Sequence, residues 1–232
     1  MNLEVKVASA IALLNKIADE YEPAVFANSF GAEDMVLTDL IARHAPGIEI
    51  ISLDTGRLHQ ETYDLMQETA DHYGIRIEVF FPRHDLVEDY LAERGPNAFY
   101  DSVELRKQCC NIRKLEPLKR ALSGRKAWIT GLRREQSPTR SDLAVSEYDA
   151  ANGLQKFSPL LDWSQGEVWS YIREHGVPYN ALHDRGFPSI GCAPCTRAVT
   201  VGEDIRAGRW WWESPATKEC GLHVAAARRK AA

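Results

Sequence analysis

The sequence predicts an α/β fold built on a mostly parallel, doubly wound β-sheet. Short apolar runs alternate with longer segments of helical periodicity, which is the pattern of repeated strand–helix–strand units. Polar turns that contain glycine follow several of the apolar runs, as expected where parallel strands end at a ligand site. The chain of 232 residues is 44% hydrophobic, so it can bury the core that such a sheet requires.

Each element follows from its local pattern, taken from the N-terminus onward. Apolar residues that recur every three or four positions predict helices over 5–21, 34–43, 58–73, 86–93, 103–122 and 164–175. Apolar, β-branched or aromatic runs predict strands over 24–27, 48–53, 75–80 and 127–131. The polar sequence from there through residue 153 is expected to be irregular. Ser164 with Glu167 three residues later is typical of a helix-capping box.

The cysteine count and the charge narrow the class of protein. The chain begins without the apolar run of a secretory signal, so we expect a cytoplasmic protein whose five cysteines serve metal binding or catalysis rather than disulfides. No apolar run approaches the roughly 18 residues of a membrane span, so we expect no membrane association. The net charge of −5 argues against nonspecific nucleic-acid binding. Basic residues between 106 and 120 form either a solvated face or a site for an anion.

Three polar turns follow predicted strands and are candidates for a nucleotide site. They are 29–34, 53–57 and 131–134, the last continued by 135–140. Because the carboxyl ends of parallel strands share one sheet edge, these turns should line one cleft. A helix N-terminus after Gly31 offers N–H groups to an anion, although an ordinary turn with Asp34 as the helix cap would have the same sequence. The turns also supply arginines that can bind phosphate or sulfate in a bidentate way, namely Arg133, Arg134 and Arg140.

Four of the cysteines are candidate metal ligands. Cys109-Cys110 and Cys192-Ala-Pro-Cys195 together give four thiolates, which suit zinc or an iron–sulfur cluster. Buried inert thiols or a redox dithiol would share parts of this pattern. Adjacent cysteines demand an unusual backbone to reach two corners of a zinc tetrahedron, which favours a 4Fe-4S cluster. Lys114, one helical turn beyond Cys110, is either near this anionic group or exposed to solvent.

The C-terminal sequence holds the fifth cysteine. Cys220 stands alone beside Gly221, and the nearby His223 could help its thiol to ionise, so Cys220 is a candidate nucleophile in a mobile tail, with a buried structural cysteine as the alternative. The run 210–212 of three tryptophans is expected to pack at least two rings in the core, with a docking surface for a partner protein as the alternative.

Taken together, these motifs resemble the assimilatory adenylyl-sulfate (adenosine 5′-phosphosulfate, APS) reductases of the iron–sulfur type. The resemblance runs from about residue 24 to residue 223, and its most specific parts are the four-cysteine pattern and the Glu-Cys-Gly-Leu-His sequence of 219–223. It implies the adenine nucleotide α-hydrolase-like (PP-loop) fold. Phe30, Glu33 and Asp34 depart from the parent loop Ser-Gly-Gly-x-Asp-Ser, which disfavours ATP pyrophosphatase chemistry.

The resemblance also implies an activity, which is thioredoxin-dependent reduction of APS to sulfite and AMP in sulfate assimilation and cysteine biosynthesis. Cys220 would carry the sulfur as S-sulfocysteine until thioredoxin or glutaredoxin releases sulfite. One 4Fe-4S cluster per subunit would be bound by Cys109, Cys110, Cys192 and Cys195. The implied substrate-binding residues are Ser29, Gly31, Glu33, Asp34, Leu53, Thr55, Gly56, Arg57, Lys114, Gly131, Arg133, Arg134, Arg140 and His223.

Two parts of the chain are expected from this division of roles. Residues 1–176 would form a nucleotide-binding α/β domain that includes Cys109-Cys110. Residues 177–232, which are rich in Gly, Pro and Cys at their start, would complete the cluster site and end in the mobile catalytic tail. The sequence leaves open whether the protein forms a homo-oligomer.

Three other functions fit parts of the sequence. A 3′-phosphoadenylyl-sulfate (PAPS) reductase would keep the tail cysteine, but such enzymes typically lack the four cluster cysteines. A cluster-containing ATP pyrophosphatase that thiolates tRNA would consume ATP. A redox sensor without enzymatic activity would use the cluster and the tail cysteine as switches and would turn over no sulfonucleotide.

Overall fold

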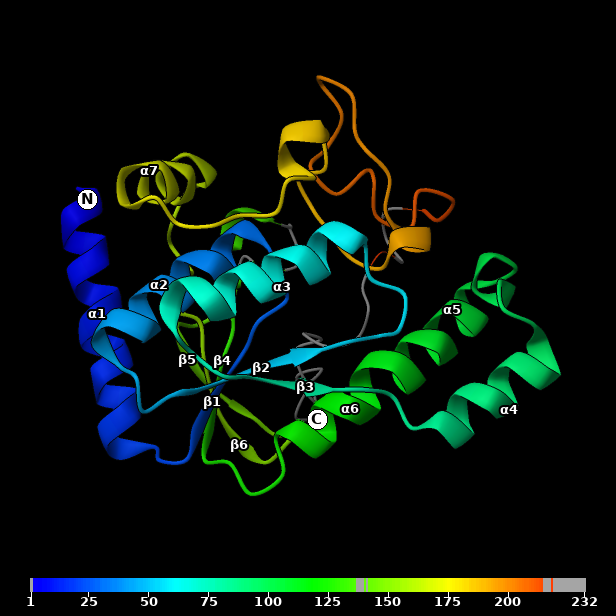
Figure 1. Cartoon of the computed structure of the whole chain (residues 1–232), viewed down its shortest axis with the longest axis horizontal. Helices are drawn as coiled ribbons and strands as arrows, with labels where there is room; N and C mark the ends of the chain where they lie inside the picture. Colours follow the sequence, from blue (N-terminus) through cyan, green and yellow to red (C-terminus); the bar gives the residue numbers. More distant parts are fainter. Residues whose placement is uncertain (1, 137–139, 141, 215–217, 219–232) are drawn as a thin grey trace, which may run out of the picture.

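The fold is a single six-stranded sheet covered by helices on both faces, in a computed structural model that describes residues 2–136, 140, 142–214 and 218 (Figure 1). The strands lie in the order β3-β2-β1-β4-β6-β5. All neighbouring pairs are parallel except the edge strand β5, which is antiparallel to β6. The bounds are β1 (Ala24–Ala27), β2 (Glu49–Leu53), β3 (Ile77–Phe80), β4 (Ala127–Ile129), β5 (Ser146–Asp149) and β6 (Leu154–Phe157). The predicted α/β class with a mostly parallel sheet is confirmed.

Most of the predicted helices are present at the expected positions. They are α1 (Leu3–Glu20), α2 (Ala32–His44), α3 (Gln60–Tyr73), α4 (His84–Arg94), α5 (Val103–Cys110), α6 (Glu116–Ala121) and α7 (Gln165–His175). None of the helices in the described part of the chain is long and apolar enough to cross a membrane.

Alternation along the strands divides the core between the two faces of the sheet. Phe26 of β1 packs into one cluster with residues of α1, α2, α3 and α7. Its neighbour Val25 points the other way and packs with Leu118 and Ala121 of α6. Successive side chains of a strand face opposite sides, so central strands buried on both sides read as continuous apolar runs. Figure 1 shows α6 across the sheet from α2 and α3.

The predicted helix over 103–122 is interrupted in the structure. After Cys110 the chain forms a π-helical segment, Asn111–Leu115, before α6 begins. A π-turn inserts an extra residue per turn and is frequent at functional sites. Cys109 and Cys110 are therefore the last two residues of α5, directly before the helical geometry changes.

The structure also contains a hairpin where irregular sequence was expected. β5 and β6 are joined by a turn that ends in Asn152 and Gly153, and Gly153 has a positive φ of 74°. The expectation of irregular structure up to residue 153 was wrong for β5. This strand lacks an apolar run because it lies at the sheet edge and its residues are mostly polar, so the sequence pattern did not indicate it. The Asn-Gly pair between two runs was the available hairpin signal.

The three tryptophans of residues 210–212 differ in how far their side chains are exposed. Trp210 is 1% exposed, and Trp212 packs against Tyr100 with 4.4 Å between ring centroids. Trp211 is 40% exposed. Trp210 is therefore buried in the core, Trp212 is only partly buried against Tyr100, and Trp211 reaches the surface.

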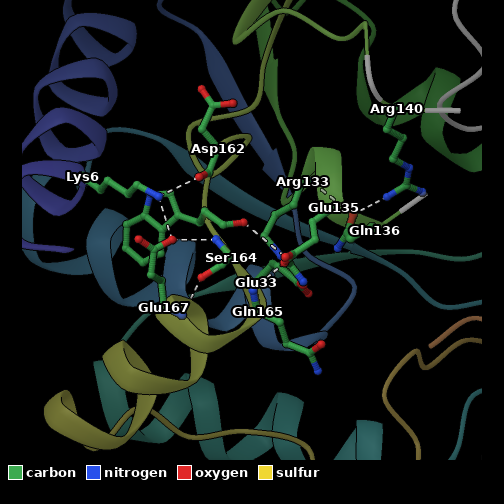
Figure 2. A network of polar contacts seen from close by, with 11 residues as sticks. Lys6, Glu33, Arg133, Glu135, Gln136, Arg140, Asp162, Ser164, Gln165 and Glu167 are labelled. Atoms are coloured by element: carbon green, nitrogen blue, oxygen red, sulfur yellow. Dashed lines mark hydrogen bonds and ion pairs between the residues drawn. The ribbon is translucent and has the colours of Figure 1, made fainter. Parts of the chain in front are cut away.

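The start of α7 provides a test of how the fold is stabilised. The Ser164 Oγ accepts a hydrogen bond from the Glu167 backbone N–H at 3.2 Å, and the Glu167 carboxylate accepts from the Ser164 N–H at 2.6 Å, so the predicted capping box is confirmed. Lys6 of α1 donates to the same carboxylate at 2.7 Å (Figure 2). This cap therefore joins α1 to α7.

Replacing Ser164 with alanine should lower the free energy of unfolding by about 0.5–2 kcal/mol, because one helix N–H loses its acceptor. Chemical denaturation measures the change. The matched control is Ser123→Ala, at an exposed position after α6, which should change the stability by less than about 0.5 kcal/mol. Equal stability of S164A and the wild type would contradict a role for the cap.

Candidate active site

A cavity of about 610 Å³ lies at the carboxyl ends of β1, β2 and β4. Residues 28–34 after β1, Leu53 and Thr55 at the end of β2, and residues 130–133 after β4 form its wall. Ligands of open α/β sheets bind at this edge. Among the residues expected to bind substrate, those that line the cavity are Ser29, Gly31, Glu33, Asp34, Leu53, Thr55, Lys114, Gly131, Arg133 and Arg140.

The first turn is held in shape by a buried carboxylate. The Asp34 Oδ2 accepts hydrogen bonds from the backbone N–H of Ser29 at 2.7 Å and from its hydroxyl at 2.6 Å. Burial raises the pKa of Asp34 to about 6, although the bonds from Ser29 lower it. Phe30, which follows Ser29, has a φ of 61° and its ring is buried in the core, and Gly31 is the N-cap residue that precedes α2. Left-handed backbone in a bulky residue is rare and is concentrated at functional sites.

Gly131 allows β4 to approach this turn. A Cβ atom at position 131 would lie 2.1 Å from the Asp34 Oδ1 and 3.1 Å from the Glu33 Cβ. Only glycine fits such a contact without movement of one of the two turns. The first and third turns are therefore packed directly against each other.

Arg133 is engaged with protein carboxylates (Figure 2). Its Nε donates to the Glu33 Oε1 at 2.8 Å, and its Nη1 donates to the Glu135 Oε2 at 2.8 Å. The same Glu135 oxygen accepts from the backbone N–H of Gln165, at the start of α7. Arg133 is only 2% exposed. Its main structural role is therefore to join the N-termini of α2 and α7 at the cavity wall.

The other arginines of the third turn have different surroundings. Arg140 lines the cavity and donates to the Gln136 side-chain oxygen, which also accepts from the Arg133 N–H at 3.1 Å (Figure 2). Arg134 is not part of the cavity wall. Its Nε donates to Asp162 at 2.7 Å, and its Nη1 donates to a backbone carbonyl.

Four of the expected site residues remain to be placed. Gly56 has a φ of 69° and Arg57 packs over the Phe99 ring at 4.9 Å, and neither lines the cavity. Cys220 and His223 lie outside the described residues. The roles expected for these two stay predictions.

Sequence reasoning missed several residues of the C-terminal segment that line the cavity. Arg206, Arg209 and His183 all contribute to its wall. Arg209 is 7% exposed, donates to the Ile190 carbonyl at 2.9 Å and packs over the Trp210 ring at 4.7 Å. The signal was weak, because these residues stand in irregular sequence where no periodicity indicates which side chains turn inward.

The four cysteines line a second, much smaller cavity. Cys109 and Cys110 come from the end of α5, Cys192 precedes the 3₁₀ turn Ala193–Cys195, and Cys195 ends it. This cavity measures about 20 Å³. The Thr55 hydroxyl, from the wall of the larger cavity, contacts the Cys192 Sγ at 3.2 Å. The cationic residues that line the smaller cavity are Arg57, Arg106, Arg113 and Lys114. Lys114 lines both cavities.

The thiols affect one another electrostatically. Burial, together with the charges of Cys192 and Cys110, raises the pKa of Cys195 to about 12, although Lys114 and Arg209 act to lower it. Burial also raises the pKa of Cys109, and Arg113 opposes this effect. Thiols with raised pKa values bind a metal only by losing their protons, and neighbouring cations favour that loss.

The donor set of the small cavity consists of four thiols, a type that suits zinc or an iron–sulfur cluster. Within the part of the chain that the structure describes, no group of three or more His, Cys, Asp or Glu side chains is arranged to hold one metal ion. Tetrahedral zinc draws its ligands to about 2.3 Å from one centre. The four thiols line one small cavity together with four cationic side chains, and once deprotonated such an all-thiol donor set could hold a metal centre.

A buried ion pair closes this cavity from the C-terminal side. The Arg106 Nε and Nη2 donate to the two carboxylate oxygens of Glu213, each at 2.8 Å. The two side chains are 0% and 3% exposed. The Arg106 guanidinium also packs over the Trp210 ring at 4.7 Å. The residues after Cys195 are thereby fixed to α5.

Comparisons with known proteins point to one family. The model of the phosphoadenosine phosphosulfate reductase domain matches residues 23–198. The adenosine 5′-phosphosulfate reductase of Allochromatium vinosum is 60% identical over 221 residues, which are 95% of this chain and 86% of that protein. The enzyme of the same name from Burkholderia cepacia is 54% identical over 96% of this chain and 89% of its own length.

Solved structures with the same fold extend this result. A phosphoadenylyl-sulfate reductase from Candida auris has a TM-score of 0.70 and 27% identity, and the match covers 85% of this chain and 96% of that one. An FMN adenylyltransferase from Candida glabrata has a TM-score of 0.60 at 17% identity, over 94% of this chain and 77% of its own. The second match reports on the fold alone, and it agrees with the expected PP-loop architecture.

The close approach at Gly131 can be tested by adding one methyl group. Gly131→Ala should lower the free energy of unfolding by about 1–3 kcal/mol, because the new Cβ forces the Asp34 carboxylate away. The control is Gly47→Ala, where a Cβ would meet nothing within 4 Å. Denaturation midpoints should fall for G131A and stay within error for G47A, and equal midpoints would mean that the two turns adapt freely.

Proposed function

Since this chain belongs to the phosphoadenosine phosphosulfate reductase family, we propose that it reduces adenosine 5′-phosphosulfate to sulfite and AMP. The observation that carries the proposal is the contact between the two cavities. A sheet-edge cavity of nucleotide size shares Lys114 with the four-cysteine cavity, and Thr55 bridges them. Relatives of 50–60% identity over most of the chain are adenosine 5′-phosphosulfate reductases, which supports this substrate over its 3′-phosphorylated form.

The charge distribution suggests how the substrate lies. Lys114 and Arg209 both lower the pKa of Cys195, so these cations lie near the cysteines while also lining the larger cavity. The phosphosulfate would bind there, beside Arg206 and Arg209. The nucleoside would extend toward the turns after β1 and β4, where Glu33 and Asp34 leave no place for a phosphate.

Cys109, Cys110, Cys192 and Cys195 would hold one 4Fe-4S cluster per subunit. When bound, the cluster would stabilise this end of the site and contribute negative charge near the substrate, without passing electrons to sulfur. Lys114 would offset this charge and orient the sulfate, while Arg113 keeps the π-helical turn against β2 through its hydrogen bond to the Thr55 carbonyl at 2.6 Å.

The chemistry would be nucleophilic catalysis by Cys220. Its thiolate attacks the sulfur atom of the substrate, the S–O bond to the phosphate breaks, and AMP leaves with the bonding electron pair. A thiolate of thioredoxin or glutaredoxin then attacks the Cys220 Sγ and expels sulfite, and the second thiol of that donor resolves the mixed disulfide. The two electrons thus come from the donor's dithiol.

The remaining sequence expectations belong to this proposal. Residues 1–176 would supply the nucleotide cavity and 177–232 the second cysteine pair and the tail with Cys220 and His223. Closure of this tail over the substrate and its opening toward the thiol donor would alternate in each turnover. A cytoplasmic location and binding of neither nucleic acid nor membrane are parts of the same proposal, which leaves a homo-oligomer open.

The decisive experiment concerns the nucleophile. Wild-type protein mixed with adenosine 5′-phosphosulfate but no reductant should gain an SO₃ adduct on Cys220, detected by mass spectrometry. Cys220→Ser should form no adduct and should lower sulfite formation by more than about 1000-fold, while it still binds AMP. An adduct on another residue, or a preference of the wild type for the 3′-phosphorylated substrate, would contradict the proposed function.

The metal assignment has its own test. Anaerobically purified wild-type protein should contain about four iron and four sulfide per chain, and Cys192→Ser should lose both with their visible absorbance. Cys220→Ser serves as the control, because it removes a thiol from outside the proposed ligand set and should keep the iron. Zinc without sulfide in the wild type would overturn the cluster.

A further inference from the structure

His183 is a cavity residue that the proposed chemistry leaves without a role. It begins the 3₁₀ turn His183–Arg185 after α7 and lines the larger cavity. Its Nε2 atom is buried and has no hydrogen-bond partner among the described residues. A buried polar atom without a partner costs free energy, so its presence in the wall of a ligand cavity points to a bond made with the ligand.

The ring of His183 is held in place by its neighbours. It packs edge-to-face against Trp169 of α7, with centroids 5.2 Å apart and an interplanar angle of 84°. Trp169 in turn packs at 90° against Tyr179, also at 5.2 Å. A ring fixed on one side by a tryptophan presents its free nitrogen in a defined position, as a specificity contact requires.

The surroundings of the ring bear on whether Nε2 can accept a hydrogen bond. Burial lowers the pKa of His183 below its usual value, and the charge of Glu33 and an interaction with the Phe187 backbone oppose this effect. The net direction favours the neutral imidazole over the charged form. A neutral imidazole accepts a hydrogen bond at the ring nitrogen that carries no proton, and the buried Nε2, which has no partner among the described residues, is available for this role.

The surroundings indicate which part of a nucleotide would donate this bond. The charges of Glu33 and Asp184 act on His183, so carboxylates lie near the ring. Carboxylates commonly bind ribose hydroxyls and disfavour phosphate. The cations Lys114 and Arg209, in contrast, lie near Cys195. His183 therefore lies near two carboxylates, of which Glu33 is also paired with Arg133.

We propose that His183 is a specificity-determining residue whose Nε2 accepts a hydrogen bond from a ribose hydroxyl of the bound nucleotide, an inference that rests on the proposed function. A free hydroxyl satisfies the buried nitrogen. A phosphate ester at the same position offers no proton at neutral pH and meets Glu33 and Asp184. His183 thus favours nucleotides whose ribose is unmodified.

Calorimetric titration with AMP, 2′-deoxy-AMP and 3′-deoxy-AMP tests this contact. His183→Ala should weaken AMP binding about 3- to 10-fold, and one of the two deoxynucleotides should bind the wild type more weakly by a similar factor. The His183→Ala change and the missing hydroxyl remove the same hydrogen bond, so their effects on affinity should not multiply. H183A should therefore bind that deoxynucleotide about as well as it binds AMP. The control His44→Ala, at the exposed far end of α2, should leave all three affinities unchanged.

His183→Gln provides a second variant, because its side-chain oxygen is also an acceptor. It should retain more AMP affinity than H183A. If H183A does not fold, the affinity of H183Q for AMP tests the contact in its place. Unchanged AMP affinity in both variants, or losses that multiply with both deoxynucleotides, would overturn the contact. A wild-type chain that binds no AMP would instead contradict the proposed function and this inference with it.

Discussion

The buried ion pair between Arg106 and Glu213 is the interaction on which the arrangement of the site depends. Two charges withdrawn from water are tolerated only when each satisfies the other, and here both guanidinium-to-carboxylate bonds are 2.8 Å long. The Trp210 ring, between Arg106 and Arg209, adds a second contact at 4.7 Å from each. Together they fix the segment after Cys195 onto α5, so that both cysteine pairs face one cavity.

The π-helical turn after Cys110 makes the same region part of the larger cavity. It carries Arg113, which donates to the Thr55 carbonyl, and Lys114, which lines both cavities. A regular α-helix would rotate these side chains differently relative to the preceding cysteines. The nucleotide cavity and the thiol cavity are therefore one connected structure, in which a change of helical geometry sets the position of the shared cation.

What the sequence could predict was local. The alternation of strands and helices, the capping box at Ser164 and the meeting of three turns follow from periodicity and from the parallel sheet. It could not show that Arg133 is held by Glu33 and Glu135, because that depends on packing between residues far apart in the chain. His183 escaped for a related reason, since in irregular sequence no pattern distinguishes an inward from an outward side chain.

The left-handed backbone at Phe30 has a consequence for how this protein can vary. Glycine would relieve the conformational strain there but would remove a ring that fills the core, and any other large side chain would keep the strain. Neither change is favourable alone. The residue at position 30 is thus restricted both by the backbone torsion angle and by the volume of its side chain. In related sequences, a substitution there should be accompanied by compensating replacements among the surrounding apolar residues.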